Sequence, residues 1–210
     1  MLRNLEIMDT TLRDGEQTSG VSYSPNEKLT IAKLLLEELN VDRIEVASAR
    51  VSDGELNSVK QITNWAKENK KIDRIEVLTF LDDGKSLKWL MKSGCNVQNL
   101  LTKGSLNHLK HQLKKTPKNH FKDISKIIIA YEPVWSIGTG LIPKSNDLTN
   151  SISYIKSKFG RKTPKVLYGG SVNNKNIDEL KDINIIDGFL VGGASQNSKK
   201  FIDIIKKTFN

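Results

Sequence analysis

Four strings decide how this sequence folds, and each of them begins at the end of a short apolar run. They read DTTLRDGEQ at residues 9–17, AYEPVWSIGTG at residues 130–140, LYGGSV at residues 167–172 and LVGGAS at residues 190–195. Apolar, β-branched runs alternate along the chain with amphipathic stretches, a rhythm that is typical of βαβ units. The sequence therefore predicts an α/β fold with a parallel sheet, in which these strings form turns that follow the strands.

The apolar runs predict about seven strands. They cover residues 5–8, 43–47, 74–80, 97–101, 126–130, 165–167 and 188–191. Helices are expected to begin after Ser24 and Ser52, and later helices are expected near residues 84–92, 106–124, 147–158, 175–180 and 199–209. Pro117 is expected to break the longest of these in two, because proline cannot continue the helical hydrogen bonds.

The first two helix starts carry the same capping pattern. Ser24 stands three residues before Glu27, and Ser52 stands three residues before Glu55. In a capping box the serine hydroxyl accepts from the backbone N–H of the glutamate, whose carboxylate accepts from the backbone N–H of the serine. After the first of these helix starts, apolar residues recur at a helical spacing, at Leu29, Ala32, Leu35, Leu36 and Leu39.

Length and composition favour one globular domain. The chain has 210 residues, whereas a full (β/α)8 barrel typically needs about 250. No apolar run approaches the roughly 18 residues of a membrane span, and no signal-peptide pattern opens the sequence. Cys95 is the only cysteine, which excludes an internal disulfide and fits a reducing compartment. We therefore expect a cytoplasmic protein without a membrane partner.

The net charge of +9 raises the question of a nucleic-acid partner. The lysines are scattered along the expected helices without interleaved aromatic residues, and no nucleic-acid motif is present. We therefore favour a solvated, lysine-rich set of outer helices and expect no nucleic acid. The basic field would still help to capture a small phosphorylated or carboxylated metabolite.

The string DTTLRDGEQ resembles the motif of strand 1 in the 2-isopropylmalate, homocitrate and citramalate synthase family, and the resemblance covers residues 1–124. It implies that Arg13 polarises the carbonyl of a keto acid and that Asp14 binds a divalent metal. A guanidinium and a metal can both stabilise the negative charge that develops on such a carbonyl. Glu45 is a weaker candidate for a second acidic group.

The chain departs from that family in its metal ligands. The family completes its metal site with a His-x-His pair from a late strand, but the only histidines here are His108, His111 and His120, in the expected helical stretch after strand 4. We interpret these histidines as solvated helix residues. One carboxylate alone holds a divalent cation weakly, so synthase activity is not expected.

The three later strings resemble loops 6, 7 and 8 of triosephosphate isomerase, and this resemblance covers residues 125–210. It implies that Glu132 is the catalytic base and that Pro133-Val134-Trp135 is the hinge of a lid. The residues that the resemblance assigns to phosphate are Gly138, Ser171, Gly192 and Gly193. Glycines let a backbone approach an anion closely, and they also make tight barrel turns. No cofactor is implied by this resemblance.

Two groups that the isomerase requires have no counterpart. Its strand-1 lysine is replaced by the segment that holds Arg13, and Lys103 falls where a neutral histidine belongs after strand 4. A cation at Lys103 could polarise a carbonyl, but its proton affinity does not suit proton shuttling between two oxygens. Misplaced or missing groups cost about 10²–10⁴ in rate, so turnover near that of the isomerase family is not expected.

Both resemblances imply a (β/α)8-barrel-like fold, the TIM barrel, as a single domain over residues 1–210. Residues 1–124 would supply βα units 1–4 and residues 125–210 units 6–8, which leaves one unit missing at the join. Strand number, tilt and stagger are linked in a closed barrel. The loss must therefore shrink the barrel, leave a gap, or expose strand edges that could pair with a second copy in a homodimer.

Three functions stay open from the sequence. The first is a triosephosphate-isomerase-like barrel that binds a sugar phosphate with weak or absent catalysis. The second is a relic of a metal-dependent acyltransferase that uses Arg13 and Asp14. The third is a designed or chimeric barrel without enzymatic activity.

Overall fold

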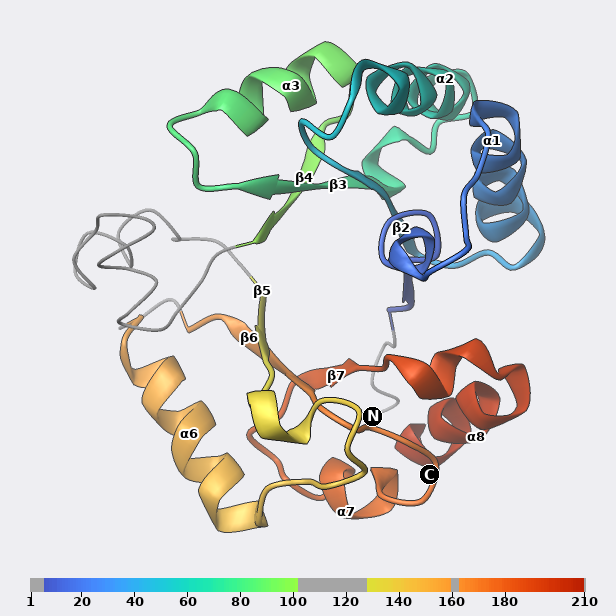
Figure 1. The fold of residues 1–210 in the computed structure, drawn as a ribbon. Helices are drawn as coiled ribbons and strands as arrows, with labels where there is room; N and C mark the ends of the chain where they lie inside the picture. Colours follow the sequence, from blue (N-terminus) through green and yellow to red (C-terminus); the bar gives the residue numbers. More distant parts are fainter. Residues whose placement is uncertain (1–5, 102–127, 160–162, 210) are drawn as a thin grey trace. The chain divides into compact units, whose positions relative to one another are not determined.

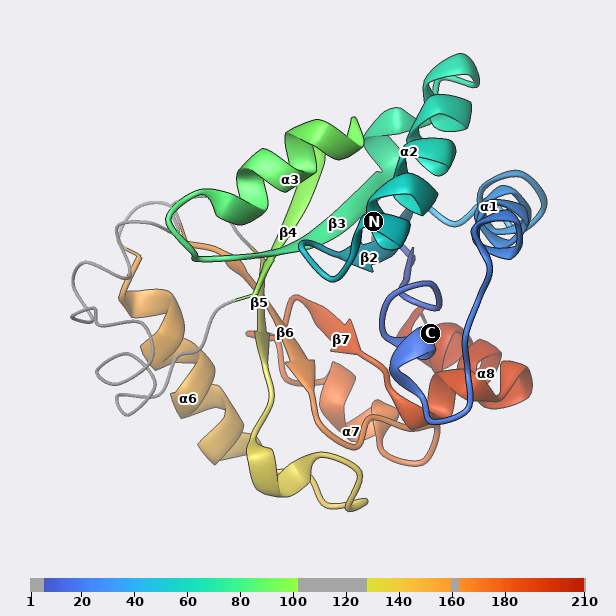
Figure 2. The same cartoon turned by 45° about the horizontal axis from the view of Figure 1, so that its top comes forward.

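The computed structural model describes residues 6–101, 128–159 and 163–209 of the chain. They form two compact units, an N-terminal unit that contains residues 6–101 and a C-terminal unit that contains the other two ranges. Each unit has its own parallel sheet with helices packed against it, as Figures 1 and 2 show from two directions. The two sheets have four and three strands within the described residues, and these correspond to the seven apolar runs from which the sequence predicts about seven strands.

The N-terminal unit is a sheet of four parallel strands in the order β1-β2-β3-β4. The strands are β1 (Met8–Asp9), β2 (Arg43–Ser48), β3 (Ile75–Phe80) and β4 (Val97–Leu101). Its α-helices are α1 (Pro25–Lys33), α2 (Asp53–Glu68) and α3 (Lys85–Ser93), and shorter helical segments cover Gly15–Gln17, Leu34–Glu38 and Ile72–Arg74. Figure 1 shows the α-helices on one face of this sheet.

The core of the N-terminal unit lies between that face and the helices. Ile44 and Val46 of β2 and Ile75 and Val77 of β3 are fully buried there. The helices contribute Ala32, Val59, Ile62 and Ala66. The alternate residues Arg43 and Glu45 of β2 are polar, whereas Ala47, which follows an irregularity in the pairing with β3, belongs to the core.

The first helix begins as its sequence predicts. The Ser24 hydroxyl accepts from the backbone N–H of Glu27 at 3.3 Å, and the Glu27 carboxylate accepts from the N–H of Ser24 at 2.7 Å. The hydrogen bond from the backbone N–H of Ser24 to the Glu27 carboxylate lowers the pKa of Glu27. The helix then widens into a π-helix over Leu34–Glu38, where the N–H of Leu39 bonds to the carbonyl of Leu34. A π turn contains more residues than an α turn. The change of period moves Leu39 off the core face, and 69% of it is exposed although its spacing continues the helical pattern.

The second capping box is only half formed. The Ser52 hydroxyl accepts from the backbone N–H of Glu55 at 3.0 Å, as predicted. The Glu55 carboxylate does not return to Ser52 but accepts two hydrogen bonds from the Lys28 ammonium. Bonds between two charged groups are stronger than a bond to a neutral N–H, which explains the exchange.

The C-terminal unit is a sheet of three parallel strands in the order β5-β6-β7. The strands are β5 (Ile128–Tyr131), β6 (Lys165–Gly169) and β7 (Gly188–Leu190), and the helices are α6 (Ser145–Ser157), α7 (Ile177–Lys181) and α8 (Ser198–Phe209). Two 3-10 helices cover Val134–Ser136 and Gly193–Gln196. Its core contains Leu148, Ile152, Val166, Tyr168, Ile177, Leu180 and Ile204.

The predicted strands agree with the observed ones to within a few residues. The strand expected at residues 5–8 lies instead at Met8–Asp9, whereas Val97–Leu101 is placed without error. The expected helix over 106–124 and the effect of Pro117 lie outside the described residues. The prediction of one barrel domain over residues 1–210 and that of a homodimer stay predictions.

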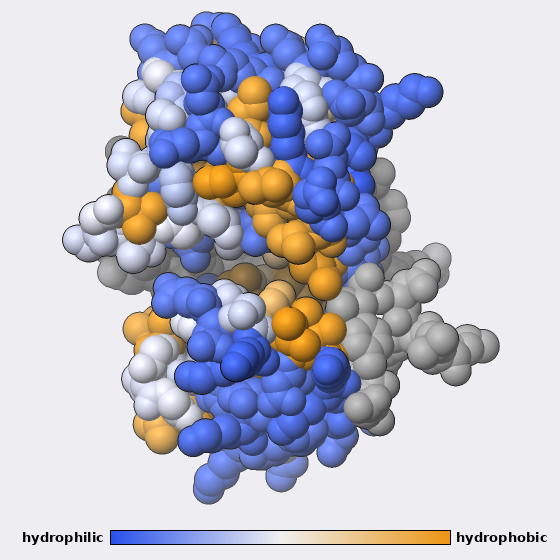
Figure 3. All heavy atoms as spheres, turned by 90° about the vertical axis from the view of Figure 1, so that its right-hand side faces the viewer, coloured by the Kyte–Doolittle hydropathy of each residue, from blue (hydrophilic) through white to orange (hydrophobic). Residues whose placement is uncertain are grey.

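None of the described helices is long and apolar enough to cross a membrane. Figure 3 shows a view of the surface in which hydrophilic residues predominate and hydrophobic residues are interspersed. Ile202 on α8 and Leu39 after α1 are among the exposed large hydrophobic residues.

Candidate functional site

The string at residues 9–17 forms a tight turn at the end of β1. The Asp9 carboxylate accepts from the backbone N–H of Thr11 at 2.8 Å and from its hydroxyl at 3.1 Å. The carbonyl of Thr10 accepts from three successive N–H groups, those of Arg13, Asp14 and Gly15. Leu12 is 1% exposed and belongs to the core of the N-terminal unit. Leu12 therefore packs the turn against the core, whereas the two charged residues that follow it, Arg13 and Asp14, are less buried.

Arg13 is held by two side chains, Glu45 and Asp14. Its Nε donates to the carboxylate of Glu45 on β2, and its Nη1 donates to Asp14 at 2.8 Å. The second oxygen of Glu45 accepts from the amide of Asn99 on β4 at 2.8 Å. Glu45 is fully buried, and this burial raises its pKa although Arg13 and Asn99 oppose the rise. The guanidinium is therefore held by Glu45 of β2 and by Asp14, and Asn99 of β4 holds Glu45 in turn.

Asp14 is the exposed member of this group. The Asp14 side chain is 60% exposed, against 19% for Arg13 and none for Glu45. In the part of the chain that the structure describes, no group of three or more His, Cys, Asp or Glu side chains is placed to hold a metal ion. The role of Asp14 as a metal ligand therefore stays a prediction that rests on the resemblance.

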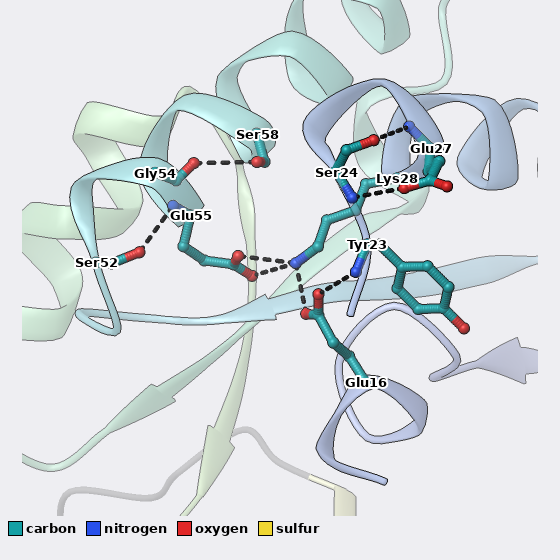
Figure 4. A network of polar contacts seen from close by, with 9 residues as sticks. All are labelled: Glu16, Tyr23, Ser24, Glu27, Lys28, Ser52, Gly54, Glu55 and Ser58. Atoms are coloured by element: carbon teal, nitrogen blue, oxygen red, sulfur yellow. Dashed lines mark hydrogen bonds and ion pairs between the residues drawn. The ribbon is translucent and has the colours of Figure 1, made fainter. Parts of the chain in front are cut away.

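A second charged cluster secures the same turn to two helices. Lys28 of α1 is 1% exposed, and its ammonium donates to Glu16 at 2.6 Å and to both oxygens of Glu55 at 2.9 and 2.8 Å. Figure 4 shows the ammonium between the two carboxylates, with Glu16 also accepting from the backbone N–H of Tyr23. The sequence analysis missed Lys28, because nothing in its local pattern separates a buried lysine from a solvated one.

The C-terminal unit places Glu132 directly after β5. Tyr131 pairs with Tyr168 in the parallel ladder, so Glu132 stands beside Gly169 at the end of β6. A Cβ atom at Gly169 would lie 2.8 Å from Cγ and 3.1 Å from Oε1 of Glu132. Contacts below 3.0 Å are too close for real side chains, so the position of Glu132 requires glycine at residue 169.

The segment that follows Glu132 is tied down by buried hydroxyl groups. The hydroxyl of Ser136 donates to the carbonyl of Leu141 at 2.5 Å and lies 3.0 Å from the hydroxyl of Tyr168. Both Ser136 and Tyr168 are fully buried, and burial raises the pKa of Tyr168. The Thr139 hydroxyl donates to the carbonyls of Trp135 and Ser136. Residues 133–141 therefore have a defined conformation, and we call them the lid segment.

Ser171 joins the turn after β6 to the lid segment. Its hydroxyl donates to the carbonyl of Ser136 at 2.5 Å and accepts from the backbone N–H of Gly140 at 2.8 Å. Gly138 lies between these two residues of the lid segment, in an exposed turn with a φ of 70°. The structure therefore brings together the parts of the predicted phosphate site that come from the first two of the three strings.

Gly192 and Gly193 form the third part, after β7. Leu190 pairs with Gly169 in the ladder, so Gly192 and Ser171 each follow a paired residue by two positions at the same edge of the sheet. Both glycines are exposed, and a Cβ atom at either would meet nothing within 4 Å. The carbonyl of Gly192 accepts from the N–H and the hydroxyl of Ser195, which fixes the turn.

Each of the two half-sites that the sequence predicts lies within one unit, but one predicted catalytic residue is not described. Lys103 lies outside the described residues, and so do His108, His111 and His120. The residues that the sequence analysis missed are Asn99 and Lys28 in the N-terminal unit and Ser136 and Tyr168 in the C-terminal unit. Tyr168 and Ser136 are part of the quoted strings, and their position in these strings could have identified them as residues of the site.

Comparison with known proteins gives two family matches. The HMGL-like family matches residues 4–134, and the triosephosphate isomerase family matches residues 95–208. Among curated proteins, triosephosphate isomerase of Mycoplasma mobile is 51% identical over 98 residues, which is 47% of this chain and 40% of that protein. Triosephosphate isomerase of Yarrowia lipolytica is 51% identical over 90 residues, which is 40% of this chain and 36% of that protein.

The similarity to these relatives covers only part of this chain and part of each relative. The chain spans no more than about 40% of the length of the curated relatives that it matches. The two family matches each cover more than half of the 210 residues, and they overlap between residues 95 and 134. The chain therefore belongs to the HMGL-like family through its first part and to the triosephosphate isomerase family through its last part, as a chimera of two TIM-barrel families.

Proposed function

We propose that the C-terminal unit binds a small sugar phosphate and that any isomerase activity of the chain is weak or absent. The observation that carries this proposal is the set of hydrogen bonds through which Ser171 meets both Ser136 and Gly140 of the lid segment. These contacts put the turn after β6 and the lid segment together next to Glu132. The relatives named above are triosephosphate isomerases, which supports a phosphorylated substrate.

The chemistry of this site would divide between backbone and carboxylate. N–H groups of Gly138, Ser171, Gly192 and Gly193 would donate to phosphate oxygens, since an exposed glycine turn lets an anion come close to the backbone. The Glu132 carboxylate, at the end of β5, would remove the proton next to the substrate carbonyl. The lack of a side chain at Gly169 leaves the space that the Glu132 side chain occupies, which supports a place for this base beside the end of β6.

Weak activity is expected because the strand-1 lysine has no counterpart and Lys103 stands in place of the neutral histidine. The carbonyl oxygen develops negative charge as the proton leaves, and a positioned donor must stabilise it. At the end of β1 the chain has Asp9 and the turn that leads to Arg13, and Arg13 is already paired with Glu45 and Asp14. Loss of one such donor typically costs about 10²–10³ in turnover.

Two measurements test this function. Titration with inorganic phosphate and with glycerol 3-phosphate, followed by calorimetry, tests the binding. A coupled assay on glyceraldehyde 3-phosphate, run on the chain and on Glu132→Ala, tests the catalytic part. Equal rates for the two proteins would contradict a role for Glu132 as the base, and the absence of phosphate binding would contradict the proposal as a whole.

A second candidate function is supported by the arrangement around Arg13. A guanidinium held by Glu45, which is itself held by Asn99, is preorganised to bind a keto acid, which fits a relic of a metal-dependent acyltransferase. Asp14 would hold the divalent metal, which would polarise the same carbonyl. Titration with Mg²⁺, Mn²⁺ and Zn²⁺ tests this candidate, with Asp14→Asn as the control. A dissociation constant above the millimolar range for all three metals would remove it and leave the non-enzymatic barrel as the alternative to sugar-phosphate binding.

A further inference from the structure

Ser171 has a backbone conformation that serine rarely adopts. Its φ is 50°, in the left-handed region, and it follows Gly170, whose φ is 137°. The left-handed conformation costs a residue with a side chain about 1–2 kcal/mol relative to the right-handed one. Other contacts in the fold must therefore hold Ser171 in place.

Two asparagines of the following turn supply these contacts. The side-chain amide of Asn176 donates to the Ser171 carbonyl at 2.8 Å, and that of Asn173 donates to the same carbonyl at 3.0 Å. Each asparagine is itself fixed through its other atom. Oδ1 of Asn176 accepts from the N–H of Asn173 at 2.9 Å, and Oδ1 of Asn173 accepts from the N–H of Lys175 at 2.9 Å.

Ser171 is therefore held from two sides. The asparagines fix its carbonyl, and the lid segment fixes its hydroxyl through Ser136 and Gly140. Among the described residues, no hydrogen bond uses the backbone N–H of Ser171. With the carbonyl and the hydroxyl both fixed, this N–H keeps one direction and remains free to donate to a ligand.

We propose that Asn173 and Asn176 are positioning residues that hold the Ser171 N–H in the direction in which it meets a bound phosphate. The inference rests on the proposed function and adds to it two residues that do not touch the ligand. The two asparagines stabilise the left-handed conformation of Ser171 and so remove the cost that phosphate binding would otherwise have to meet.

Exchange of asparagine for aspartate separates the two roles of each side chain. Asn173→Asp and Asn176→Asp keep an oxygen that accepts from the backbone N–H, but they replace the donor by an oxygen that faces the Ser171 carbonyl. Asn174→Asp is the matched control, because Asn174 lies in the same turn but donates to Asp203 instead of Ser171. Asn176→Ala removes the donor without adding charge.

The probe is inorganic phosphate, titrated by calorimetry and by NMR of the Ser171 amide. We expect Asn173→Asp and Asn176→Asp to weaken phosphate binding by about tenfold or more, as for the loss of a hydrogen bond together with a repulsive contact. Asn176→Ala should weaken it by about three- to tenfold, and Asn174→Asp by less than about threefold. The phosphate-induced shift of the Ser171 amide should persist in Asn174→Asp and disappear in the two test variants.

A purely structural role would give another pattern. Asparagines that only stabilise the turn would lower the urea midpoint without changing the affinity of the folded protein or the amide shift. Equal weakening by Asn174→Asp and Asn176→Asp would show an effect of charge alone and would overturn the inference, while the proposed function would stand. If the unchanged chain does not bind phosphate, the proposed function fails and this inference fails with it.

Discussion

The two half-sites are built from different kinds of chemical groups. In the N-terminal unit the site consists of paired charged side chains, of which Glu45 and Lys28 are buried, with Arg13 on Glu45 and Lys28 between Glu16 and Glu55. In the C-terminal unit it consists of backbone groups and small hydroxyls, with Ser136 and Ser171 at its centre. A buried charge depends on every one of its partners, whereas a hydrogen-bonded turn depends mainly on backbone conformation. The N-terminal site should therefore be far more sensitive to single substitutions.

The largest effect is expected at Lys28. Lys28→Met leaves the carboxylates of Glu16 and Glu55 without their cation, and loss of one partner from a buried ion pair costs about 3–5 kcal/mol. Urea unfolding followed by circular dichroism measures the loss. Lys60→Met, on the exposed face of α2, is the control and should change the free energy of unfolding by less than about 0.5 kcal/mol. Similar values for the two variants would show that the cluster contributes nothing to stability.

The next effect concerns Cys95, the only cysteine of the chain. Its thiol is buried in the N-terminal unit, and burial raises its pKa from 9.0 to about 11. At pH 8 the thiolate fraction therefore falls about 100-fold, because each pKa unit is a factor of ten. Labelling by a thiol reagent should be at least that much slower in the native protein than in urea.

Cys95 lies in the N-terminal unit, so the labelling rate gives the free energy of opening of that unit alone. This value can be compared with the free energy of unfolding of the whole chain, measured by circular dichroism. Equal values would support the predicted single domain, and a smaller value for labelling would contradict it.

A third, smaller effect is expected at Gly169. Gly169→Ala places a methyl group against Cγ of Glu132, and overpacking of this kind costs about 1–3 kcal/mol. Gly54→Ala, in the first turn of α2, makes only an ordinary contact and should leave stability unchanged or raise it by up to about 1 kcal/mol. Thermal unfolding of both variants measures the difference, and an equal response would mean that Glu132 is free to move away from β6.

The smallest effect is the pH dependence that Glu45 contributes. Burial raises its pKa above the unfolded value near 4.5, so the folded protein binds its proton more tightly than the unfolded chain does. Stability from this group is therefore present at low pH and declines as the pH rises above about 4.5. The free energy of unfolding of the chain relative to Glu45→Gln should fall between pH 4 and pH 7. A rise over that interval would show that the attraction of Arg13 outweighs burial.

Sequence reasoning succeeded where the information is local. The capping box at Ser24 and the strand Val97–Leu101 follow from residues that are neighbours in the chain, and the structure confirms both. The π-helix that displaces Leu39 was not foreseen, because the apolar spacing fits an uninterrupted α-helix equally well. The parts of the site that depend on a quoted string were identified by their resemblance to known families.

Contacts between distant elements could not be read from the sequence. Glu55 matches a capping box, yet it bonds to Lys28, which lies 27 residues away. Asn99 reaches Glu45 across 54 residues, and only the order of the strands brings them together. Such pairs depend on which strands and helices become neighbours, and periodicity carries no information about that.

The ladder between β5 and β6 has a consequence for how such a chain can arise. Glu132, the lid segment and Ser171 all come from these two strands and the turns after them, so their contacts are inherited as one block. A genetic crossover anywhere before residue 128 would leave every one of these contacts intact. Recombination can thus transplant this piece of an ancestral enzyme whole, while groups supplied by earlier strands are left behind.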